Sequence, residues 1–223
     1  MAYWVLKGLL SPVFYLLWSV KVEGLEYVPS SGPAVLAANH QSFCDSLFIP
    51  LVVRRKVTFL AKAEYFDSWH TSWFFRAVGQ IPIRRGGGPQ SERAIETAKE
   101  VLKAGHLLAL YPEGTRSIDG KVHKGRTGVA RLSREVGVPV IPIGISGTPE
   151  VQPVDALLMR PFRSVTIRFG PPIQMVPASD PCNPMADHDH AICRDFTDRL
   201  MREIARLAGS EYTDTYVLKR VPT

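Results

Sequence analysis

Cysteine is scarce in this sequence, with three in 223 residues: Cys44, Cys182 and Cys193. An odd number in a chain of this length argues against a disulfide framework and indicates a reducing compartment. None of the cysteines has the CxxC spacing typical of zinc sites. Repeats and low-complexity tracts are also absent. Apolar types make up 45% of the residues and charged types 22%, the profile of an ordinary folded domain, which excludes a membrane bundle and a disordered tail.

Acidic residues are the smaller charged class, 21 against 27 basic ones, and the formal net charge is +6. This surplus favours anionic partners. Phosphorylated metabolites, acidic lipid surfaces and nucleic acid all satisfy it, so the charge by itself leaves the partner open.

Polar residues are few at the N-terminus, where residues 1–20 carry a single charge, on Lys7. The positive charge and small residues of a cleavable signal are not arranged here in their usual order. Lys7, Ser11, Tyr15 and Ser19 recur every four residues and would form a narrow polar stripe on an apolar helix. We expect an amphipathic membrane-associating helix over residues 1–20, lying in one leaflet ahead of a domain over 21–223. A buried core helix and a full membrane span are the alternatives.

Further along the chain, short apolar runs alternate with helical patterns, the order typical of an α/β fold with a largely parallel central sheet flanked by helices. Ser91 is a suitable N-cap for a helix that Gly105 would end. A second helix is expected over about 127–136, and a third would turn Ile192, Phe196 and Leu200 inward. The expected strands span residues 34–38, 57–61, 107–111, 140–145 and 165–169.

A histidine and an aspartate follow the first of these strands, in the stretch Asn39 to Asp45. On a regular helix His40 and Asp45 would point apart, so they pair only if the chain bends between them. Ser42 as an N-cap would supply that bend and place Asp45 in the first turn. A carboxylate on one ring nitrogen would leave the other to take a proton from a substrate hydroxyl. The alternative is a capping acid beside an ordinary turn histidine.

A second polar stretch, residues 111–117, follows the 107–111 strand. Gly114 allows close backbone approach, Thr115 and Ser117 offer hydroxyls, and Arg116 offers a planar fork suited to phosphate. Glu113 is unusual beside an anion site and would need a cation. An ordinary polar turn would use similar residues. The cations that could hold Glu113 are Lys62, Arg84, Arg85 and Lys124.

Other arrangements carry less chemistry. Arg84 and Arg85 precede three glycines and suggest a cationic rim, but the Gly-Lys-Ser/Thr of a phosphate loop is missing. The run 187–190 is Asp-His-Asp-His, whose side chains suit a metal, yet a polar cap before a helix is the simpler interpretation. Nothing in the sequence near Cys44 lowers its pKa, so we expect a packed thiol. Residues 144–148 do not form a nucleophile elbow.

Four blocks in order resemble those of the glycerolipid acyltransferase family, which includes bacterial 1-acylglycerol-3-phosphate acyltransferases. The NHxxxxD block matches at Asn39, His40 and Asp45, and the PEGTR block at residues 112–116. The apolar Val-Pro-Val-Ile-Pro block matches at 138–142, and the resemblance covers residues 20–170.

The second block, usually Gly-x-Ile-Phe-Ile-Asp-Arg, is looser in this chain. Gly79, Ile81, Ile83 and Arg85 match, whereas Pro82 replaces the aromatic residue and Arg84 replaces the acid. A cation therefore stands where the family often has a carboxylate.

The resemblance implies transfer of a fatty acyl group from a thioester, acyl-CoA or acyl carrier protein, to the free hydroxyl of lysophosphatidic acid or a related lysophospholipid. It implies His40 as the general base, oriented by Asp45. It also implies a membrane lipid acceptor and a peripheral or monotopic place on the cytoplasmic face of the cell membrane. No permanent cofactor, metal or nucleic acid is expected. The implied substrate-binding residues are Lys62, Arg84, Arg85, Glu113, Gly114, Thr115 and Arg116.

Other functions stay open at this point. Glycerol-3-phosphate, another lysophospholipid or a glycolipid would suit the same machinery as acceptor. A thioesterase would use the same histidine with water as acceptor and would have no need of the PEGTR cations. A non-catalytic lipid-surface binding protein would keep the basic faces and tolerate loss of His40.

Overall fold

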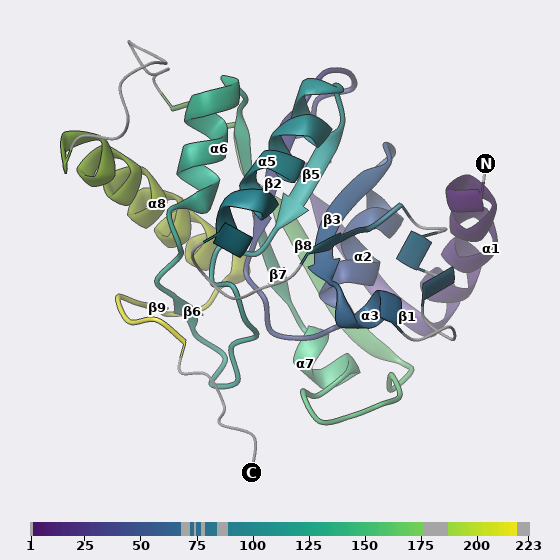
Figure 1. Cartoon of the computed structure of the whole chain (residues 1–223). Coiled ribbons are helices and arrows are strands. Elements are labelled where there is room, and N and C mark those ends of the chain that lie inside the picture. The colour runs from purple at the N-terminus through teal and green to yellow at the C-terminus, as the bar shows by residue number, and fades with distance from the viewer. Residues whose placement is uncertain are drawn as a thin grey trace.

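The computed structural model describes residues 2–67, 72–73, 75–76, 79–83, 89–175 and 187–217. Its centre is a seven-stranded sheet with the order β1-β8-β7-β2-β5-β3-β4 (Figure 1). All neighbouring strands are parallel except β7 and β8. Two short strands, β6 and β9, pair separately. The strands are β1 (Trp18–Glu23), β2 (Ala34–Ala38), β3 (Val57–Lys62), β4 (Ile81–Ile83), β5 (Leu107–Leu110), β6 (Val122–His123), β7 (Val140–Ser146), β8 (Arg163–Phe169) and β9 (Tyr212–Thr213).

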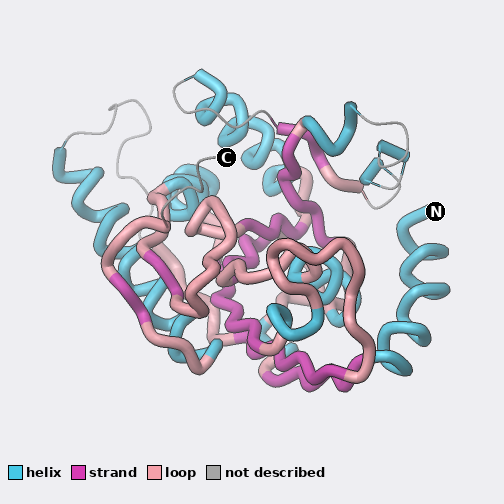
Figure 2. The backbone as a smooth tube through the Cα atoms, turned by 90° about the horizontal axis from the view of Figure 1, so that it is seen from below, coloured by secondary structure: helices cyan, strands magenta, loops and turns pink. Residues whose placement is uncertain are grey.

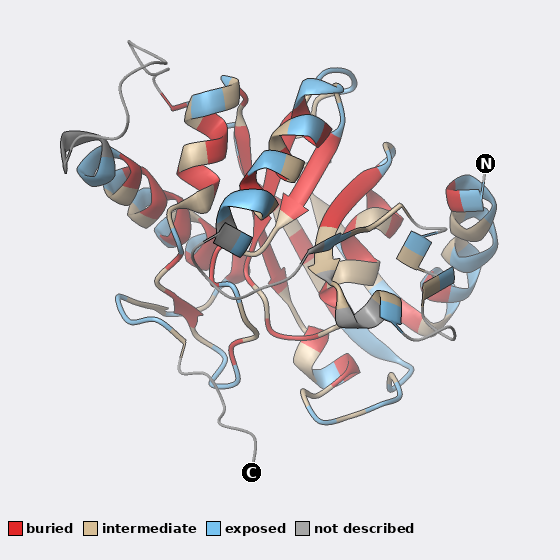
Figure 3. Ribbon diagram, in the orientation of Figure 1, coloured by how far each residue is buried: buried red, intermediate tan, exposed pale blue. Residues whose placement is uncertain are grey.

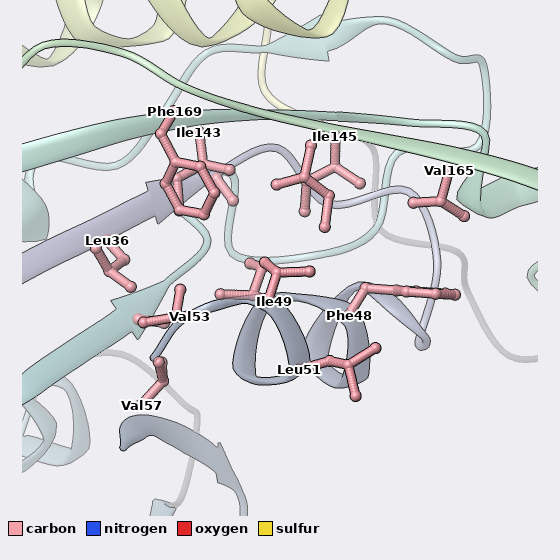
Figure 4. Packing of buried hydrophobic residues seen from close by; sticks show 14 of the residues in the cluster. Leu36, Phe48, Ile49, Leu51, Val53, Val57, Ile143, Ile145, Val165 and Phe169 are labelled. Atoms are coloured by element: carbon pink, nitrogen blue, oxygen red, sulfur yellow. The ribbon is translucent and has the colours of Figure 1, made fainter. Parts of the chain in front are cut away.

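Helices cover both faces of the sheet, as the alternation of patterns predicts. On one face, α2 packs its apolar side against β7 and β8, as Figure 4 shows for Phe48 and Ile49 beside Ile143, Ile145 and Val165. On the other face, α5, α6 and α8 form a second buried cluster with alternate residues of β2 and β7. The described helices are α1 (Ala2–Leu17), α2 (Asp45–Val52), α3 (Glu64–Asp67), α5 (Pro89–Lys103), α6 (Gly128–Val136), α7 (Thr148–Val151) and α8 (Asp187–Ala208), with a 3-10 turn η1 (Leu25–Tyr27).

The central strands are apolar on both faces because both are covered. Every residue of β2 is buried, and Figure 3 shows burial concentrated in the strands and on the helix sides that face them. All five expected strands are present: β2 has the expected ends, and each of the other four differs at one end by one or two residues. The sequence analysis did not predict β1 or β4, which form the two edges of the sheet.

The expected helix ends are partly wrong. The helix predicted from Ser91 begins at Pro89, since proline is well suited to a first helical turn. Ile192, expected on the core face of α8, is exposed, and the neighbouring Cys193 is buried in its place.

The N-terminal helix is shorter than expected and is oriented differently. It ends at Leu17, and residues 18–20 belong to β1, because Trp18 begins a parallel pairing with β8 and packs against Phe14 and Phe48. Pro12 lies inside the helix.

Only part of the polar stripe is turned away from water: Lys7 and Ser11 are half-buried, whereas Tyr15 and Ser19 are exposed and Ser19 belongs to β1. Lys7 donates a hydrogen bond to the main-chain oxygen of Val53, and Ser11 donates to the oxygen of Lys7 at 2.7 Å. The outward side of α1 is apolar and exposed; it includes Trp4, Val5, Leu9, Val13 and Leu16. Within the described residues, no helix combines the length and the hydropathy that crossing a bilayer requires.

Candidate active site

The histidine and the aspartate that the sequence pairs are in contact. His40 follows the end of β2, and its Nδ1 lies 2.9 Å from Oδ2 of Asp45, the first residue of α2. The same carboxylate oxygen accepts the main-chain N–H groups of Gln41 and Ser42, each at 2.9 Å. Three donors therefore converge on one oxygen, and they hold the bend that brings the pair together.

The source of that bend differs from the expectation. Ser42 is not the N-cap of α2, which is Cys44 with no side-chain cap. The Ser42 hydroxyl instead donates to the main-chain oxygen of Gln152 at 2.6 Å. The Asp45 carboxylate therefore closes the turn by accepting hydrogen bonds from the residues before α2. Three convergent N–H groups compensate its buried negative charge better than the Ser42 hydroxyl alone would.

The two side chains of the pair differ in burial. The Asp45 side chain is enclosed, whereas that of His40 keeps 16% of its surface exposed. Because Nδ1 is engaged with Asp45, Nε2 is the ring nitrogen placed to exchange a proton with a bound molecule. A histidine held in this way can act chemically as an oriented general base.

Tyr111 is a site residue that the sequence analysis did not identify. Its ring stacks on His40 with centroids 3.8 Å apart and planes 8° from parallel. Its hydroxyl lies 2.9 Å from the hydroxyl of Ser46 on α2. Tyr111 follows β5, and β5 lies beside β2 in the sheet. Only the strand order, which the sequence pattern does not give, could have indicated that Tyr111 lies beside His40.

The second polar stretch is joined to the first through the main chain of His40. The Ser117 N–H donates to the His40 carbonyl at 2.7 Å, and the His40 N–H donates to Oε1 of Glu113 at 3.3 Å. Residues 112–117 and the His40 loop therefore form one hydrogen-bonded unit at the carboxyl end of two neighbouring strands, where α/β proteins gather their sites.

Glu113 is buried, with 2% of its surface exposed. Burial raises the pKa of its carboxyl to about 8, and the main-chain N–H groups of His40 and His123 offset this only in part. Its Oε2 has no hydrogen-bond partner among the described residues. The expected cation is not Lys124, which pairs with Asp214 at 2.9 Å. Arg84, Arg85 and the side chain of Lys62 lie outside what the structure describes.

The other residues of the stretch differ in accessibility. Gly114 has a φ of +76°, and a Cβ there would lie 3.0 Å from Nε of Arg126, so this position favours glycine. Thr115 and Arg116 are half-buried, and among the described residues Arg116 makes one long hydrogen bond, 3.4 Å to the Val154 oxygen. Ser117 does not offer its hydroxyl outward, because it donates to Asp119 at 2.8 Å.

Asp119 stabilises the loop that follows residues 112–117 by hydrogen bonding. It accepts from Ser117 and from the Lys121 N–H, and it lies 3.0 Å from Nε2 of His123. Burial alone would raise the pKa of this carboxyl, but the hydrogen bonds from His123, Ser117 and Lys121 outweigh burial and lower it to about 2. The carboxylate therefore stays charged and fixes the far end of the loop.

Asn39 has a structural role beside the pair. Its side-chain amide donates to the Ile145 oxygen at 2.9 Å, and its carbonyl accepts the Ile145 N–H at 2.8 Å. The side chain therefore continues the β2 to β7 ladder by one step after β2 has ended, which fixes the position from which His40 departs.

An apolar groove lies between α1 and α2 and reaches the site. Ser46 lies in its wall, and the same residue hydrogen bonds with Tyr111, which stacks on His40. The apolar wall residues are Tyr3, Leu6, Leu10 and Phe14 on α1, and Phe43, Leu47, Pro50 and Leu51 in or just before α2.

Two alternative chemistries find no support in the described residues. Cys44 is buried, and burial raises the pKa of its thiol to about 12, which agrees with a packed thiol. No group of three potential metal ligands occurs in the part of the chain that the structure describes. The side chains of Asp187, His188 and Asp189 fall outside that part.

These features place a hydrogen-bonded histidine–aspartate pair at the carboxyl edge of a mostly parallel α/β sheet. The chain belongs to the acyltransferase family, whose model, described as Acyltransferase, matches residues 19–146.

Named relatives agree with the family. The chain is 31% identical over 170 residues to a chloroplastic 1-acyl-sn-glycerol-3-phosphate acyltransferase of Arabidopsis thaliana, which covers 76% of this chain and 48% of the relative. It is 26% identical over 141 residues to the enzyme of that name from Bacillus subtilis, with 62% and 68% covered. It spans about half the length or less of the plant and algal relatives that it matches.

A solved structure has the same fold. The crystal structure of the 1-acyl-sn-glycerophosphate acyltransferase PlsC from Thermotoga maritima superposes with a TM-score of 0.64 at 26% identity. The match covers 89% of this chain and 78% of the other.

Proposed function

We propose that this chain transfers a fatty acyl group from a thioester donor, acyl-CoA or acyl carrier protein, to the free hydroxyl of lysophosphatidic acid or a related lysophospholipid. One observation carries the proposal: the His40 to Asp45 contact lies in a single hydrogen-bonded unit with the loop that holds Arg116. A base for the hydroxyl and a cation for the phosphate are therefore held together. The names of the relatives support the same acceptor.

The reaction needs one base that also returns its proton. His40 Nε2 takes the proton of the acceptor hydroxyl while the oxygen attacks the thioester carbonyl carbon. The tetrahedral intermediate then collapses, the carbon–sulfur bond breaks, and the imidazolium gives the proton to the leaving thiolate. Asp45 holds the ring and stabilises its charged form, so no acyl-enzyme is required.

The acceptor phosphate would be held by Arg116, whose side chain is half-buried beside the site. Lys62, Arg84 and Arg85 are proposed as further cations, with Gly114 and Thr115 shaping the approach. Glu113 is proposed to act through the His40 main chain and not on the phosphate, because it is enclosed and protonated near neutral pH.

Apolar surface on two sides of α1 supports the lipid nature of the substrates. The groove between α1 and α2 has apolar walls suited to an acyl chain, and the opposite side of α1 exposes Leu9, Val13 and Leu16. We place the protein on the cytoplasmic face of the cell membrane, with α1 lying in the leaflet that contains the acceptor.

The test is incubation of the purified protein with labelled acyl-CoA, with and without lysophosphatidic acid. We expect label in phosphatidic acid only when the acceptor is present, and a loss of turnover by about 10² to 10⁴-fold in His40→Ala. His106→Ala is the matched control. His106 is exposed just before β5, at the amino end of that strand, whereas His40 lies beyond the carboxyl end of β2. Free fatty acid as the main product would establish a thioesterase instead, and near-normal transfer by folded His40→Ala would overturn the mechanism.

A further inference from the structure

The segment between α7 and β8 displays apolar side chains to solvent. Leu157, Leu158 and Phe162 are 91%, 79% and 75% exposed, and among the described residues the only comparable large apolar side chain is Leu16, at 78%. Isolated exposed leucines are common on protein surfaces, but three such side chains within six residues form a patch. We call residues 156–163 the apolar loop.

Hydrogen bonds hold both ends of the apolar loop, and Met159 in its middle packs against the core of the domain. The Arg160 N–H donates to the Val151 oxygen at 2.7 Å, and the Gln152 side chain donates to the oxygens of Ala156 and Leu157 at 3.2 and 3.3 Å. Phe162 has a φ of +58°, in the left-handed region that bulky residues rarely occupy. The chain thus accepts an unfavourable backbone conformation at a residue whose ring is left exposed.

The apolar loop is continuous with the exposed side of α1. The Phe162 N–H donates to the oxygen of Leu17 at 2.7 Å, and Nε1 of Trp18 donates to the oxygen of Arg160 at 2.8 Å. Figures 1 and 2 both show the loop after α7 running to the start of β8 beside the C-terminal end of α1. Leu16, the most exposed large apolar residue of α1, lies at that end.

The other end of the same connection touches the candidate active site. Gln152 accepts the Ser42 hydroxyl at 2.6 Å, and Val154 accepts a hydrogen bond from Arg116 at 3.4 Å. Residues 152–162 therefore run from the site to α1 along one edge of the molecule.

Charge around the apolar loop has one predominant sign. Arg160 and Arg163 are exposed within it, and Asp155, just before it, is the one acid in residues 152–163. A surface with protruding leucines and an aromatic ring, flanked by arginines, matches the boundary of an anionic leaflet, where acyl chains lie beneath phosphates. Arginine side chains also reach headgroups while their stems stay in apolar surroundings.

We propose that the apolar loop is a second membrane-contacting element: Leu157, Leu158 and Phe162 enter the leaflet beside α1 while Arg160 and Arg163 bind the phosphates of anionic lipids. The proposal rests on the proposed function in one respect, that the acceptor is a membrane lipid. The loop then holds the active-site edge at the lipid surface, so that the acceptor reaches His40 without crossing water.

The test is co-sedimentation with vesicles made of equal parts of phosphatidylcholine and phosphatidylglycerol. We expect Leu157→Asp with Leu158→Asp to weaken binding by about tenfold or more, because two apolar side chains no longer enter the leaflet. Arg160→Gln with Arg163→Gln should remove most of the preference for phosphatidylglycerol over pure phosphatidylcholine. Ile192→Asp is the control, since Ile192 is exposed on α8, on the other side of the molecule from α1. Unchanged vesicle binding by the double aspartate variant would overturn the proposal.

A second measurement is independent of the folding of that variant. Leu157→Cys, in a Cys182→Ser background, carries an environment-sensitive fluorophore, and the buried Cys44 and Cys193 stay unlabelled. We expect a blue shift with the vesicles and none without them. A signal that responds to protein concentration without lipid would mean that the loop joins two copies of the chain, which would also overturn the proposal.

Failure of the proposed function gives a different pattern. The double aspartate variant should keep its turnover on a short-chain lysophosphatidic acid in solution and lose it on acceptor within vesicles. Absence of transfer to the soluble acceptor in the unaltered protein would reject the acyltransferase proposal while leaving the vesicle-binding result to decide on the loop.

Discussion

The ring of Tyr111 lies flat against that of His40, with centroids 3.8 Å apart and planes 8° from parallel. The stack limits rotation of the imidazole about the axis that its contact with Asp45 leaves open. The electron-rich face of the tyrosine also attracts the imidazolium that forms when His40 takes a proton. Tyr111 is therefore a positioning residue for the proposed base.

Two substitutions separate the Tyr111 ring from its hydroxyl. Tyr111→Phe keeps the stack and loses the contact with Ser46, worth on the order of 1 kcal/mol, so kcat should fall by only a few-fold. Tyr111→Leu removes the stack, and kcat should fall by up to about 10²-fold with little change in KM for the acyl donor. Steady-state kinetics on a soluble acceptor measure both. Equal kcat values for the two variants would show that the stack has no positioning role.

Glu113 gives the stability of the protein a specific pH dependence. Its pKa is about 8 in the folded chain and 4.5 without its surroundings. Between these values the folded chain holds a proton that the unfolded chain has released, so the free energy of unfolding falls as pH rises from 4.5 to about 8.

Glu113→Gln cannot release that proton and keeps an acceptor for the His40 N–H. We expect the stability of the variant, relative to the unaltered protein, to rise steadily across this pH window, as measured by urea unfolding at several pH values. Glu100→Gln, on the exposed side of α5, is the control. A pH-independent difference would show that Glu113 is ionised in the folded state.

We predict that the Asn39 side chain increases the free energy of unfolding. Asn39→Ala leaves the buried N–H and carbonyl groups of Ile145 without their partners, which costs about 1–3 kcal/mol in the free energy of unfolding. Asn39→Asp keeps an acceptor for the Ile145 N–H but loses the donor and buries a charge, so we expect it to be no more stable than Asn39→Ala. Urea unfolding measures both changes. Wild-type stability in both variants would contradict the role of Asn39 as an extension of the β2 to β7 ladder.

Arg116 should affect the acceptor more than the donor. Arg116→Ala should raise KM for lysophosphatidic acid by about tenfold or more and leave KM for acyl-CoA nearly unchanged, since a charged phosphate contact is lost. Arg116→Lys should recover only part of the affinity, because lysine lacks the planar fork. Arg199→Ala, exposed on α8, controls for the loss of one positive charge. An equal rise in both KM values would place Arg116 outside the phosphate site.

The membrane role of α1 calls for surface substitutions, not deletion. Removing residues 1–20 would take away half of β1 and the buried Tyr3, Phe14 and Trp18. Leu9→Asp with Val13→Asp changes only exposed positions and should weaken vesicle binding by about tenfold or more, with turnover on a soluble acceptor retained. Vesicle co-sedimentation measures the change, and Ile192→Asp is again the control. Full binding by the variant would exclude α1 from the membrane surface.

The sequence by itself determined the α/β class and the five inner strands, because apolar runs long enough for buried strands are a local pattern. It also placed His40 and Asp45 in a polar stretch at a strand end, where α/β proteins gather their sites, but the spacing left open whether the two side chains pair.

Only the tertiary structure decided which groups surround that pair. Strand order places β5 beside β2, and thereby Tyr111 against His40 and Glu113 beneath its main chain, although about seventy residues separate them in sequence. It likewise directed Lys7 of α1 toward the Val53 oxygen, while Ser11 bonds within the helix, and it left the apolar side of that helix in solvent. A periodic pattern fixes which residues share a helix face, but the direction of that face depends on what packs against it.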